Sequence, residues 1–426
     1  MTHFGLICPA STGHLNTMLP LGKELQRRGH QVTLFGIPDA ESKTLAAGLE
    51  FQGIGESEFP KGTIAESLAQ LGKLSGREAL RYTVNTLRNS AAVLLRDAPK
   101  VIKAAGVEAL LVDQASPEGG AVAEILSIPF ISISSTVVLN RDDNVPPYFT
   151  NWNYNPSWWG RLRNRLGYQL LNRTVKPITE VINQYRQEWN LPTQFSPNER
   201  YSQLAQISQQ PAELEFPREK LPQCFHFTGP YHSPVGREVP SFPYEKLTGQ
   251  PLIYASMGTI QNRLIGVFQQ IAEACLGLDA QLVISLGGSA KPESLPKLAG
   301  SPLVVEYAPQ LELLQKATLT ITHGGMNTTL ECLSNGVPMV AIPIANDQPG
   351  IAARVVWAGC GEALPIKSVN VPRLGTVIKK VLTEDSYKQN AVRLQEAIRR
   401  AGGVSRAIDI VEQAISTGKP VLAQKQ

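Results

Sequence analysis

The sequence predicts an α/β fold made of two parallel-sheet domains in tandem, and three observations lead to this prediction. A chain of 426 residues is longer than one hydrophobic core usually organises, so the length favours two domains. Short apolar runs rich in β-branched residues alternate with longer segments of helical periodicity, which is typical of βαβ units and a parallel sheet. This alternation lapses between residues 138 and 235 and then resumes.

Ten apolar runs are the strand candidates, five in each half of the chain. Helical stretches such as residues 77–105 separate them. The first five are "FGLIC" at 4–8, "QVTLFGI" at 31–37, "LEFQGI" at 49–54, "ALLVD" at 109–113 and "FISISS" at 130–135. The other five are "PLIYASMGT" at 251–259, "QLVISLGG" at 281–288, "LVVEYAP" at 303–309, "LTITHGG" at 319–325 and "PMVAIPI" at 338–344.

These runs give the expected domain bounds. Residues 1–232 form an N-terminal domain and residues 251–405 a C-terminal domain. Between them, residues 233–250 have the proline, glycine and polar content of a linker. Residues 406–426 form a last helix and tail, which we expect to pack back on the N-terminal domain. The predicted helix starts at the N-cap candidate Ser405 and stops at Gly418.

Composition excludes several classes of protein. A net charge of +4, from 40 basic and 36 acidic residues, is too slight for a general nucleic-acid-binding surface. Five scattered cysteines without a C-x-x-C pair indicate reduced thiols, not a disulfide framework or a zinc site. The first residues do not resemble a signal peptide, and no run reaches the ~20 apolar residues of a spanning helix. We therefore expect a cytoplasmic protein, at most peripheral at a membrane surface.

Residues 307–348 contain the highest concentration of candidate ligand-binding side chains. Here the strand candidate 319–325 delivers His323 and two glycines to a helix start at Asn327. Glycines allow close backbone approach, and a helix start supplies free N–H groups with a partial positive charge, so this turn predicts an anion site. His323, Asn327 and Thr328 as added donors favour a diphosphate.

Two further residues fit a nucleotide. Glu331 falls four residues after Asn327, on the same helix face, where a carboxylate can accept hydrogen bonds from a ribose diol. Tyr307, at the end of the preceding strand, is suited to stack on a base. Each residue alone has a plainer explanation as loop or core material. Their order within one strand–helix–strand unit is what favours function.

This run resembles the nucleotide-sugar signature of family 1 glycosyltransferases. The matching motifs are Tyr307-Ala308-Pro309-Gln310, His323-Gly324-Gly325-Met326-Asn327-Thr328, Glu331, Gly336-Val337-Pro338, Pro343 and Asp347-Gln348. The resemblance implies the GT-B fold, in which two Rossmann-like domains face each other across a cleft. It assigns the acceptor to residues 1–232 and the UDP-sugar to residues 251–405.

The resemblance also implies roles for single residues. Tyr307 stacks on uracil and Gln310 binds the nucleoside, while Glu331 holds the ribose. Asp347 and Gln348 read the sugar hydroxyls. The remaining expected donor-binding residues, at or near the diphosphate, are Gly13, Ser256, Thr259, Ala308, His323, Gly325, Asn327 and Thr328.

Differences from the signature indicate which subgroup of the family the sequence resembles. Plant members have tryptophan where Tyr307 stands, and cysteine and tryptophan where Gly324 and Met326 stand, so the plant subgroup is not favoured. The continuation "NDQPGIAARV" at 346–355 resembles the bacterial carotenoid glucosyltransferases, with the macrolide enzymes next. This implies transfer of a hexose, glucose by that analogy, to a small lipophilic alcohol such as a carotenoid, terpenoid, macrolide or polyphenol.

The expected catalytic pair is His14 and Asp113. Family members have a histidine after the first strand and an aspartate about a hundred residues later that orients it. Taking the proton of an acceptor hydroxyl near neutral pH suits a histidine, with an ordinary pKa of ~6.5. The helix start and His323 stabilise the leaving UDP, so no metal or tightly bound cofactor is expected. A single displacement inverts the anomeric centre. The plainer alternative is that His14 and Asp113 only pack or cap helices.

A cluster of aromatic and basic residues lies between the halves. It comprises Trp152, Trp158, Trp159, Arg161, Arg163, Arg165, Arg173 and Lys176. One interpretation is a surface helix whose tryptophans pack against the N-terminal domain. The other is a peripheral membrane contact, because tryptophan suits the headgroup region and basic side chains attract anionic lipids.

Two other functions stay open at this point. A UDP-sugar epimerase of the same architecture needs no acceptor, and a non-catalytic binding protein would use the same cleft. Incubation with UDP-sugar alone and replacement of His14 separate these from a transferase.

Overall fold

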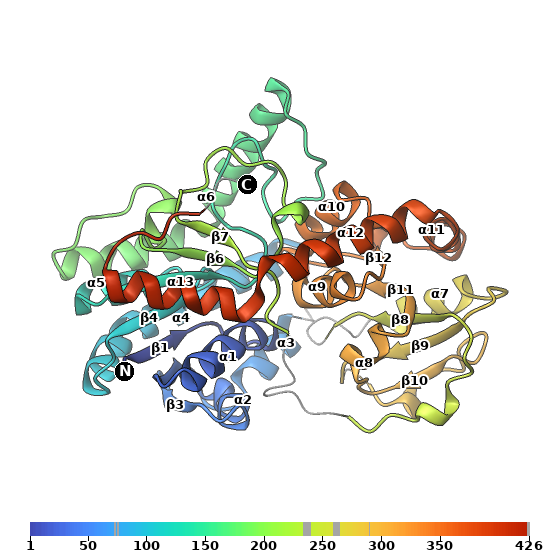
Figure 1. The fold of residues 1–426 in the computed structure, drawn as a ribbon, viewed down its shortest axis with the longest axis horizontal. Coiled ribbons are helices and arrows are strands. Elements are labelled where there is room, and N and C mark those ends of the chain that lie inside the picture. The colour runs from blue at the N-terminus through green and yellow to red at the C-terminus, as the bar shows by residue number, and fades with distance from the viewer. Residues whose placement is uncertain (72–73, 75, 233–239, 259–264, 289, 424–426) are drawn as a thin grey trace.

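The computed structural model describes residues 1–71, 74, 76–232, 240–258, 265–288 and 290–423. It contains two parallel β-sheets with helices packed on their faces (Figure 1). The prediction of an α/β protein with two parallel sheets is therefore confirmed. Residues 233–239 of the expected linker, and Thr259 of the expected donor site, lie outside the described residues.

The first sheet has seven strands in the order β3-β2-β1-β4-β5-β6-β7. Its order reverses between β1 and β4, the kind of position where open parallel sheets bind ligands. The strands are β1 His3–Ile7, β2 Gln31–Gly36, β3 Glu50–Gly53, β4 Ala109–Asp113, β5 Phe130–Ser134, β6 Gln206–Ser208 and β7 Phe225–Phe227.

The second sheet has six strands in the order β10-β9-β8-β11-β12-β13. They are β8 Leu252–Ser256, β9 Gln281–Ser285, β10 Leu303–Val305, β11 Ala317–Thr322, β12 Met339–Ala341 and β13 Gly361–Ala363. Its order reverses between β8 and β11, so the carboxyl ends of these two strands mark a second ligand position.

Thirteen α-helices run through the described residues. Those before the second sheet are α1 Thr12–Arg27, α2 Glu41–Ala46, α3 Thr63–Leu71, α4 Gly76–Ala104, α5 Gly119–Leu126 and α6 Trp158–Glu188. The others are α7 Ile265–Ala274, α8 Gln310–Leu314, α9 Met326–Ser334, α10 Gln348–Trp357, α11 Val371–Thr383, α12 Asp385–Ala401 and α13 Gly403–Thr417.

Helix α1 carries the first expected catalytic residue. Its apolar face, with Leu15, Met18 and Leu25 fully buried, packs into the core of the seven-stranded sheet. A Cβ atom at Gly22 would stand 2.9 Å from Leu6 of β1 and 2.8 Å from Leu49. Glycine at this position thus lets α1 lie close to the strands, which fixes the helix relative to the sheet edge.

The last helix, α13, returns to the seven-stranded sheet. It packs on α1 and adds Ile408, Ile410 and Val411 to that core (Figure 1). Arg28, the C-cap residue of α1, donates to Asp409 and Glu412, each at 2.7 Å. The helix begins at Gly403 and not at Ser405, because Gly402 takes a left-handed φ of 91° and separates it from α12. The N-cap assigned to Ser405 was therefore wrong.

Buried contacts join the two halves. The guanidinium of Arg354, on α10, donates from Nε and Nη2 to Oε1 of Glu215 at 3.0 and 2.6 Å. The same guanidinium lies 4.6 Å from the ring centroid of Phe216. On the same helix, a Cβ at Gly350 would come within 2.2 Å of the carbonyl oxygen of Tyr148. The half that carries α10 is thus packed against the segments 148 and 215–216 of the first half.

Candidate active site

A histidine and an aspartate meet at the carboxyl edge of the first sheet. Asp113 ends β4, and His14 stands in the first turn of α1. The Nδ1 atom of His14 is 2.7 Å from Oδ2 of Asp113, and the Asp113 side chain is 1% exposed. Its other oxygen, Oδ1, accepts a hydrogen bond from the backbone N–H of Ala115 at 2.8 Å.

This geometry decides the protonation pattern of His14. An ionised carboxylate only accepts hydrogen bonds, so Nδ1 carries the proton and Nε2 is the basic nitrogen. Burial alone would lower the pKa of His14, but the charge and hydrogen bond of Asp113, with a smaller contribution from the charge of Asp347, raise it above its ordinary value. The pair therefore has the arrangement of a general base with an orienting carboxylate.

Ser135 is a third member that the sequence analysis missed. It follows β5, is buried, and its hydroxyl hydrogen-bonds Oδ2 of Asp113 and lies 3.2 Å from Nδ1 of His14. The rule that polar residues after parallel strands gather at one edge applies to "FISISS" as it does to "ALLVD". The sequence therefore carries a signal for Ser135.

Across from this edge, β11 leads into α9 through a glycine turn. Gly324 has a φ of 77°, and Gly325 is the extended N-cap residue, which brings no capping side chain to the helix start. The first N–H groups of a helix have no partner within the helix, so this end of α9 can receive an anion. Asn327 and Thr328 lie in its first turn, as the sequence predicted.

His323 is enclosed by glycine backbone. A Cβ at Gly258 would come within 2.6 Å of its ring, and one at Gly325 within 2.4 Å. Loss of solvent around the ring lowers the pKa of His323 to about 4, only partly countered by a hydrogen bond with the Ser256 backbone. The imidazole is thus neutral near pH 7 and carries a single N–H, which it can donate to an anion only in place of the Ser256 backbone.

The expected nucleoside residues form one hydrogen-bonded group. Gln310, at the start of α8, donates from Nε2 to Glu331 at 2.5 Å and to Thr328 at 3.3 Å. Its Oε1 accepts from the hydroxyl of Tyr254 at 3.1 Å. Glu331 is 1% exposed. The structure thus brings together the residues expected at the nucleoside and the ribose.

Tyr307 and Ala308 lie beside this group. The Tyr307 side chain is 50% exposed, and its hydroxyl end lies close to the backbone of Gly288, which has a φ of 77°. Ala308 is partly buried against the hydrophobic core of the second sheet. A half-exposed aromatic ring that lies over backbone is available for stacking on a base.

Asp347 and Gln348 start α10. Burial raises the pKa of the Asp347 carboxyl, while the nearby His14 lowers it, so the two side chains interact across the halves. Gln348 is turned back on its own loop: its Oε1 accepts from the N–H groups of Ile344 and Ala345 at 2.8 and 3.1 Å. Its oxygen holds the loop that presents Asp347.

The first turns of α1 and α9 also meet directly at the expected diphosphate position. Nδ2 of Asn327 donates to the carbonyl oxygen of Gly13 at 2.8 Å. Ser256 ends β8 and is buried beside this position, and its hydroxyl accepts from the N–H of Gly258 at 3.4 Å. The residue before the expected base therefore touches the first turn of α9.

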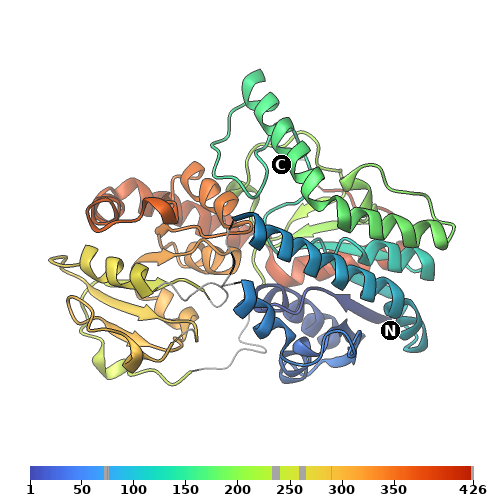
Figure 2. The same ribbon diagram turned by 180° about the vertical axis from the view of Figure 1, so that it is seen from behind.

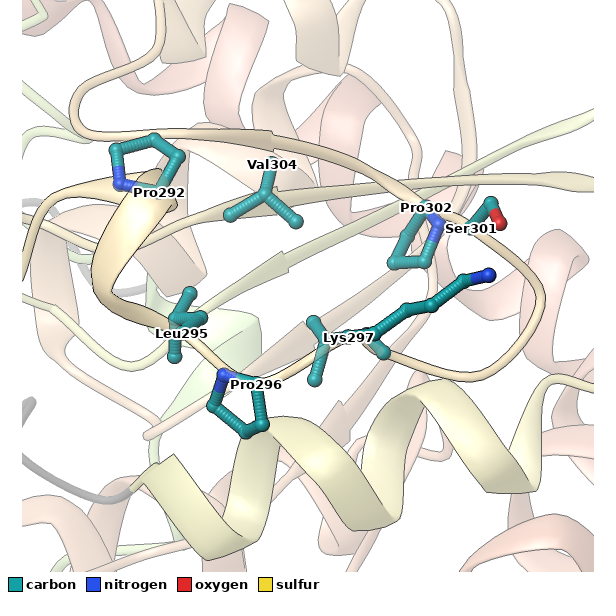
Figure 3. Close-up of a pocket in the computed structure, with 8 residues that line it drawn as sticks. Pro292, Leu295, Pro296, Lys297, Ser301, Pro302 and Val304 are labelled. Carbon is teal, nitrogen blue, oxygen red and sulfur yellow. The ribbon is translucent and has the colours of Figure 1, made fainter.

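A separate pocket lies away from these residues. Its volume is about 240 Å³, and it is lined by Pro292, Leu295, Val304 and neighbouring side chains beside β10 (Figure 3). None of the expected catalytic or donor-binding residues lines it. The candidate site is therefore defined by the converging strand ends and the start of α9.

Comparison with known proteins identifies the family. The family model "UDP-glucoronosyl and UDP-glucosyl transferase" matches residues 6–400. The chain belongs to this family. It is a glycosyltransferase that uses a UDP-sugar donor and acts on small acceptors. The predicted resemblance to family 1 glycosyltransferases is confirmed.

Relatives of this glycosyltransferase are similar over its whole length. A zeaxanthin glucosyltransferase of Pantoea ananas is 33% identical over 99% of this chain and 98% of its own. One of Pseudescherichia vulneris is 30% identical over 99% of this chain and 100% of its own. The carotenoid branch named from the sequence is thus among its similar relatives.

Solved structures agree on the fold. The glycosyltransferase of kitacinnamycin aligns with a TM-score of 0.75 at 22% identity, covering 97% of this chain and 99% of that one. A calicheamicin glycosyltransferase aligns with a TM-score of 0.74 at 20% identity, covering 99% and 100%. The GT-B fold predicted for the chain is confirmed.

Proposed function

We propose that this glycosyltransferase moves glucose from UDP-glucose to a hydroxyl group of a small lipophilic acceptor, with a carotenoid as the first candidate, and inverts the anomeric centre. Full-length similarity to two zeaxanthin glucosyltransferases supports the sugar and the acceptor class. In this proposal residues 1–232 bind the acceptor and residues 251–405 bind the donor.

The proton goes to His14. The acceptor oxygen forms a bond with the anomeric carbon as its proton passes to Nε2, and the bond from that carbon to the diphosphate oxygen breaks on the opposite face. Asp113 stabilises the imidazolium that forms, and the hydrogen bond from Ser135 keeps its carboxylate in place. One displacement gives one inversion.

The leaving UDP carries negative charge that the second half of the chain can receive. The start of α9 offers backbone N–H groups and its dipole, and neutral His323, Asn327 and Thr328 add donors. Since these groups suffice to hold a diphosphate, we propose that transfer needs no metal ion. Activity unchanged by EDTA would support this, and activity restored by Mg²⁺ after EDTA would contradict it.

The observation that carries the proposal is the 2.7 Å pair of the partly buried His14 and the buried Asp113, which lies beside the start of α9. The first test is a screen of UDP-glucose, UDP-galactose, UDP-glucuronate and UDP-N-acetylglucosamine against pooled lipophilic alcohols, read by mass spectrometry. The anomeric coupling constant of the product reports inversion. An epimerised UDP-sugar formed without any acceptor would favour the epimerase instead.

Substitution of His14, the proposed general base, distinguishes a role in transfer from a role in UDP binding. We expect His14→Ala to keep UDP affinity, because His14 makes no contact required for the diphosphate, and to lower transfer by ~10²-fold or more. Asn16→Ala on the same helix serves as the control and should leave both unchanged. Full transfer by His14→Ala would instead leave a binding role for this residue.

The exposed start of α6 supports a peripheral membrane contact. Trp158 and Trp159 stack on each other and are 63% and 62% exposed. The same exposed face continues with three leucines at helical spacing, Leu162, Leu166 and Leu170. This end of α6 projects away from both sheets (Figure 1, Figure 2).

The charges along this face suit an anionic lipid surface. Residues 158–176 contain five basic side chains and no acidic one. Arg161 and Arg165 reach acidic groups of other segments at 3.6 and 3.2 Å, but these are exposed pairs of the kind worth little in water. We propose that the apolar face enters the headgroup region while the basic residues bind anionic lipid.

Trp152 does not share this surface. It is partly buried under α6, where its ring would lie 3.1 Å from a Cβ at Gly167 and Arg163 stands 4.8 Å from its centroid. The proposed contact is therefore narrower than the sequence predicted and is made by Trp158, Trp159 and the leucines.

Among the described residues, no helix is both long enough and apolar enough to span a bilayer.

A further inference from the structure

Gln209 is a buried polar residue to which neither the sequence signature nor the proposed mechanism assigns a role. It directly follows β6 and is 2% exposed. Because Ser134 of β5 pairs with Ser208 of β6, the next residues, Ser135 and Gln209, are neighbours at the carboxyl edge of the sheet. Gln209 thus stands one strand beyond the group that holds His14.

Its side-chain amide joins three segments. Nε2 of Gln209 lies 2.5 Å from the carbonyl oxygen of Ser135, 3.0 Å from Oδ1 of Asn327 and 3.1 Å from the hydroxyl of Thr17 on α1. All three partners are acceptors, and the two hydrogens of the NH₂ group are shared among them. One buried amide thereby connects the segment after β5, the helix of the base and the helix of the expected diphosphate site.

The contact with Asn327 fixes which way its amide faces. With Oδ1 held by Gln209, the Nδ2 end of Asn327 points to the carbonyl oxygen of Gly13, to which it donates at 2.8 Å. Thr17 donates to the same carbonyl at 3.2 Å. If the Asn327 amide turned over, its oxygen would face that carbonyl oxygen, which is repulsive. Its NH₂ group would then also face the NH₂ group of Gln209, which is repulsive as well. Gln209 and the Gly13 carbonyl therefore fix the orientation of the Asn327 amide together.

We propose that Gln209 is a positioning residue that acts through Asn327, holding the first turn of α9 at a fixed distance from the first turn of α1. This inference rests on the proposed function, in which α9 binds the diphosphate and α1 carries the base. The distance between these turns sets the distance from the anomeric carbon to the attacking oxygen. Misplacement of reacting groups by ~1 Å can cost ~10²-fold in rate.

A double-mutant cycle tests the proposal. We expect Gln209→Leu to lower kcat by ~10-fold or more with a smaller change in the Kd for UDP, because the amide aligns Asn327 without contributing the main anion contacts. In an Asn327→Ala background, Gln209→Leu should have no further effect on kcat, since its only route of action is gone.

Gln206 provides a matched control. It lies on β6, is also buried, and its amide contacts Ser202 and Asn140 instead of Asn327. Gln206→Leu should leave kcat unchanged. If Gln206→Leu lowers kcat as much as Gln209→Leu does, or if the losses from Gln209→Leu and Asn327→Ala multiply, the positioning role is wrong and Gln209 only packs.

A second variant keeps the test valid if Gln209→Leu does not fold. Gln209→Glu keeps the shape of the side chain but replaces its donor with an acceptor, so it should repeat the loss of kcat and the lack of additivity. Thermal unfolding of each variant is followed by circular dichroism. Absence of transfer by the unsubstituted enzyme would overturn the proposed function and this inference with it. Multiplying losses in an enzyme that does transfer would overturn this inference alone.

Discussion

At the scale of single residues, the proposed mechanism depends on the Nδ1 atom of His14. Its contact with Asp113 leaves Nε2 as the basic nitrogen and keeps the ring in one orientation. The same contact raises the pKa of the imidazole, since the carboxylate stabilises the charged form against the effect of burial. Basicity and orientation thus have one cause.

The pH dependence of transfer follows from that shift. His14 must be neutral to accept a proton, so kcat/KM should rise with pH through a pKa above the ordinary value of histidine. Asp113→Asn removes the charge that raises the pKa of His14. We therefore expect the acidic limb of the pH–rate profile to move to lower pH and kcat to fall by ~10²-fold. Initial rates between pH 5 and 9 at saturating UDP-sugar measure both effects.

A neighbouring group titrates in the same range. Burial raises the pKa of Glu118, just before α5, to about 7, and Asp113 adds to this shift, while a backbone hydrogen bond and Arg200 oppose it. Glu118→Gln is therefore the control. A limb that moves in Glu118→Gln and not in Asp113→Asn would show that Glu118, not His14, controls the rate.

The residues of the site differ in how far sequence could reveal them. His14, Asp113 and the motif from Tyr307 to Gln348 stand out because a signature joins them. Ser135 and Gln209 carry no motif, and only the register of β5 with β6 makes them neighbours of Asp113 and Asn327. Their importance depends on hydrogen-bond geometry, which spacing along the chain does not encode.

At the scale of elements, α13 stabilises the core around α1. Ile410 is fully buried among residues of both helices. Ile410→Ala should lower the free energy of unfolding by ~2–5 kcal/mol, since it removes buried apolar contacts and leaves a cavity. Chemical denaturation measures this change. Gln413→Ala, at an exposed position of the same helix, should change stability by less than ~0.5 kcal/mol.

Helix α6 gives a prediction about membranes. The double substitution Trp158→Ser and Trp159→Ser should weaken co-sedimentation with phosphatidylglycerol vesicles, because it removes the side chains that would enter the headgroup region. Added salt should also weaken the binding of the unsubstituted protein, and phosphatidylcholine vesicles should bind it poorly.

The control for this experiment is Phe195→Ser. Phe195 is an aromatic side chain that is 89% exposed and lies beyond the other end of α6. Its replacement should leave vesicle binding unchanged. Equal loss in both variants, or equal binding to both lipids, would count against a specific contact at the start of α6.

Short elements were the ones that sequence missed. All ten strand candidates correspond to observed strands, but β6, β7 and β13 have three residues each and fell outside the prediction. Strands β10 and β12 are equally short, but they lie in the longer apolar runs "LVVEYAP" and "PMVAIPI", whereas "QIS", "FHF" and "GEA" do not form such runs. The three missed strands pair with a neighbour already in the sheet, β6 with β5, β7 with β6 and β13 with β12.

At the scale of the whole molecule, a buried ion pair joins the halves. Burial would raise the pKa of Glu215, but the charges of Arg218 and Arg354, with the hydrogen bond from Arg354, hold it below the ordinary value. The stabilisation from this carboxylate is thus present above the ordinary glutamate pKa and is lost as the pH falls.

Removing one partner should be costly. Glu215→Gln leaves the buried guanidinium of Arg354 without a countercharge, which should destabilise the contact between the halves by about 3–5 kcal/mol. In scanning calorimetry we expect one unfolding transition to separate into two. Arg400→Gln, which breaks an exposed pair with Glu213, is the control and should leave the transition unchanged.

The contacts between the two halves were the feature of the fold least predictable from the sequence. Parallel-sheet periodicity predicted two sheets, and the family resemblance predicted that they face each other. The contacts that hold them there, from Arg354 to Glu215 and from Asn327 to Gly13, join residues more than a hundred positions apart. No local pattern marks either partner for the other.

The return of the chain at α13 bears on how the two halves can move. The N–H of Gly403 donates to the carbonyl oxygen of Thr228 at 2.6 Å, and a Cβ at Gly229 would lie 3.1 Å from Ala401. The outgoing and returning connections therefore run side by side at the same edge of the molecule. Two domains joined by two adjacent chain connections can rotate about these connections but cannot translate away from them. We expect any relative motion of the two halves to leave this contact between Thr228 and Gly403 in place.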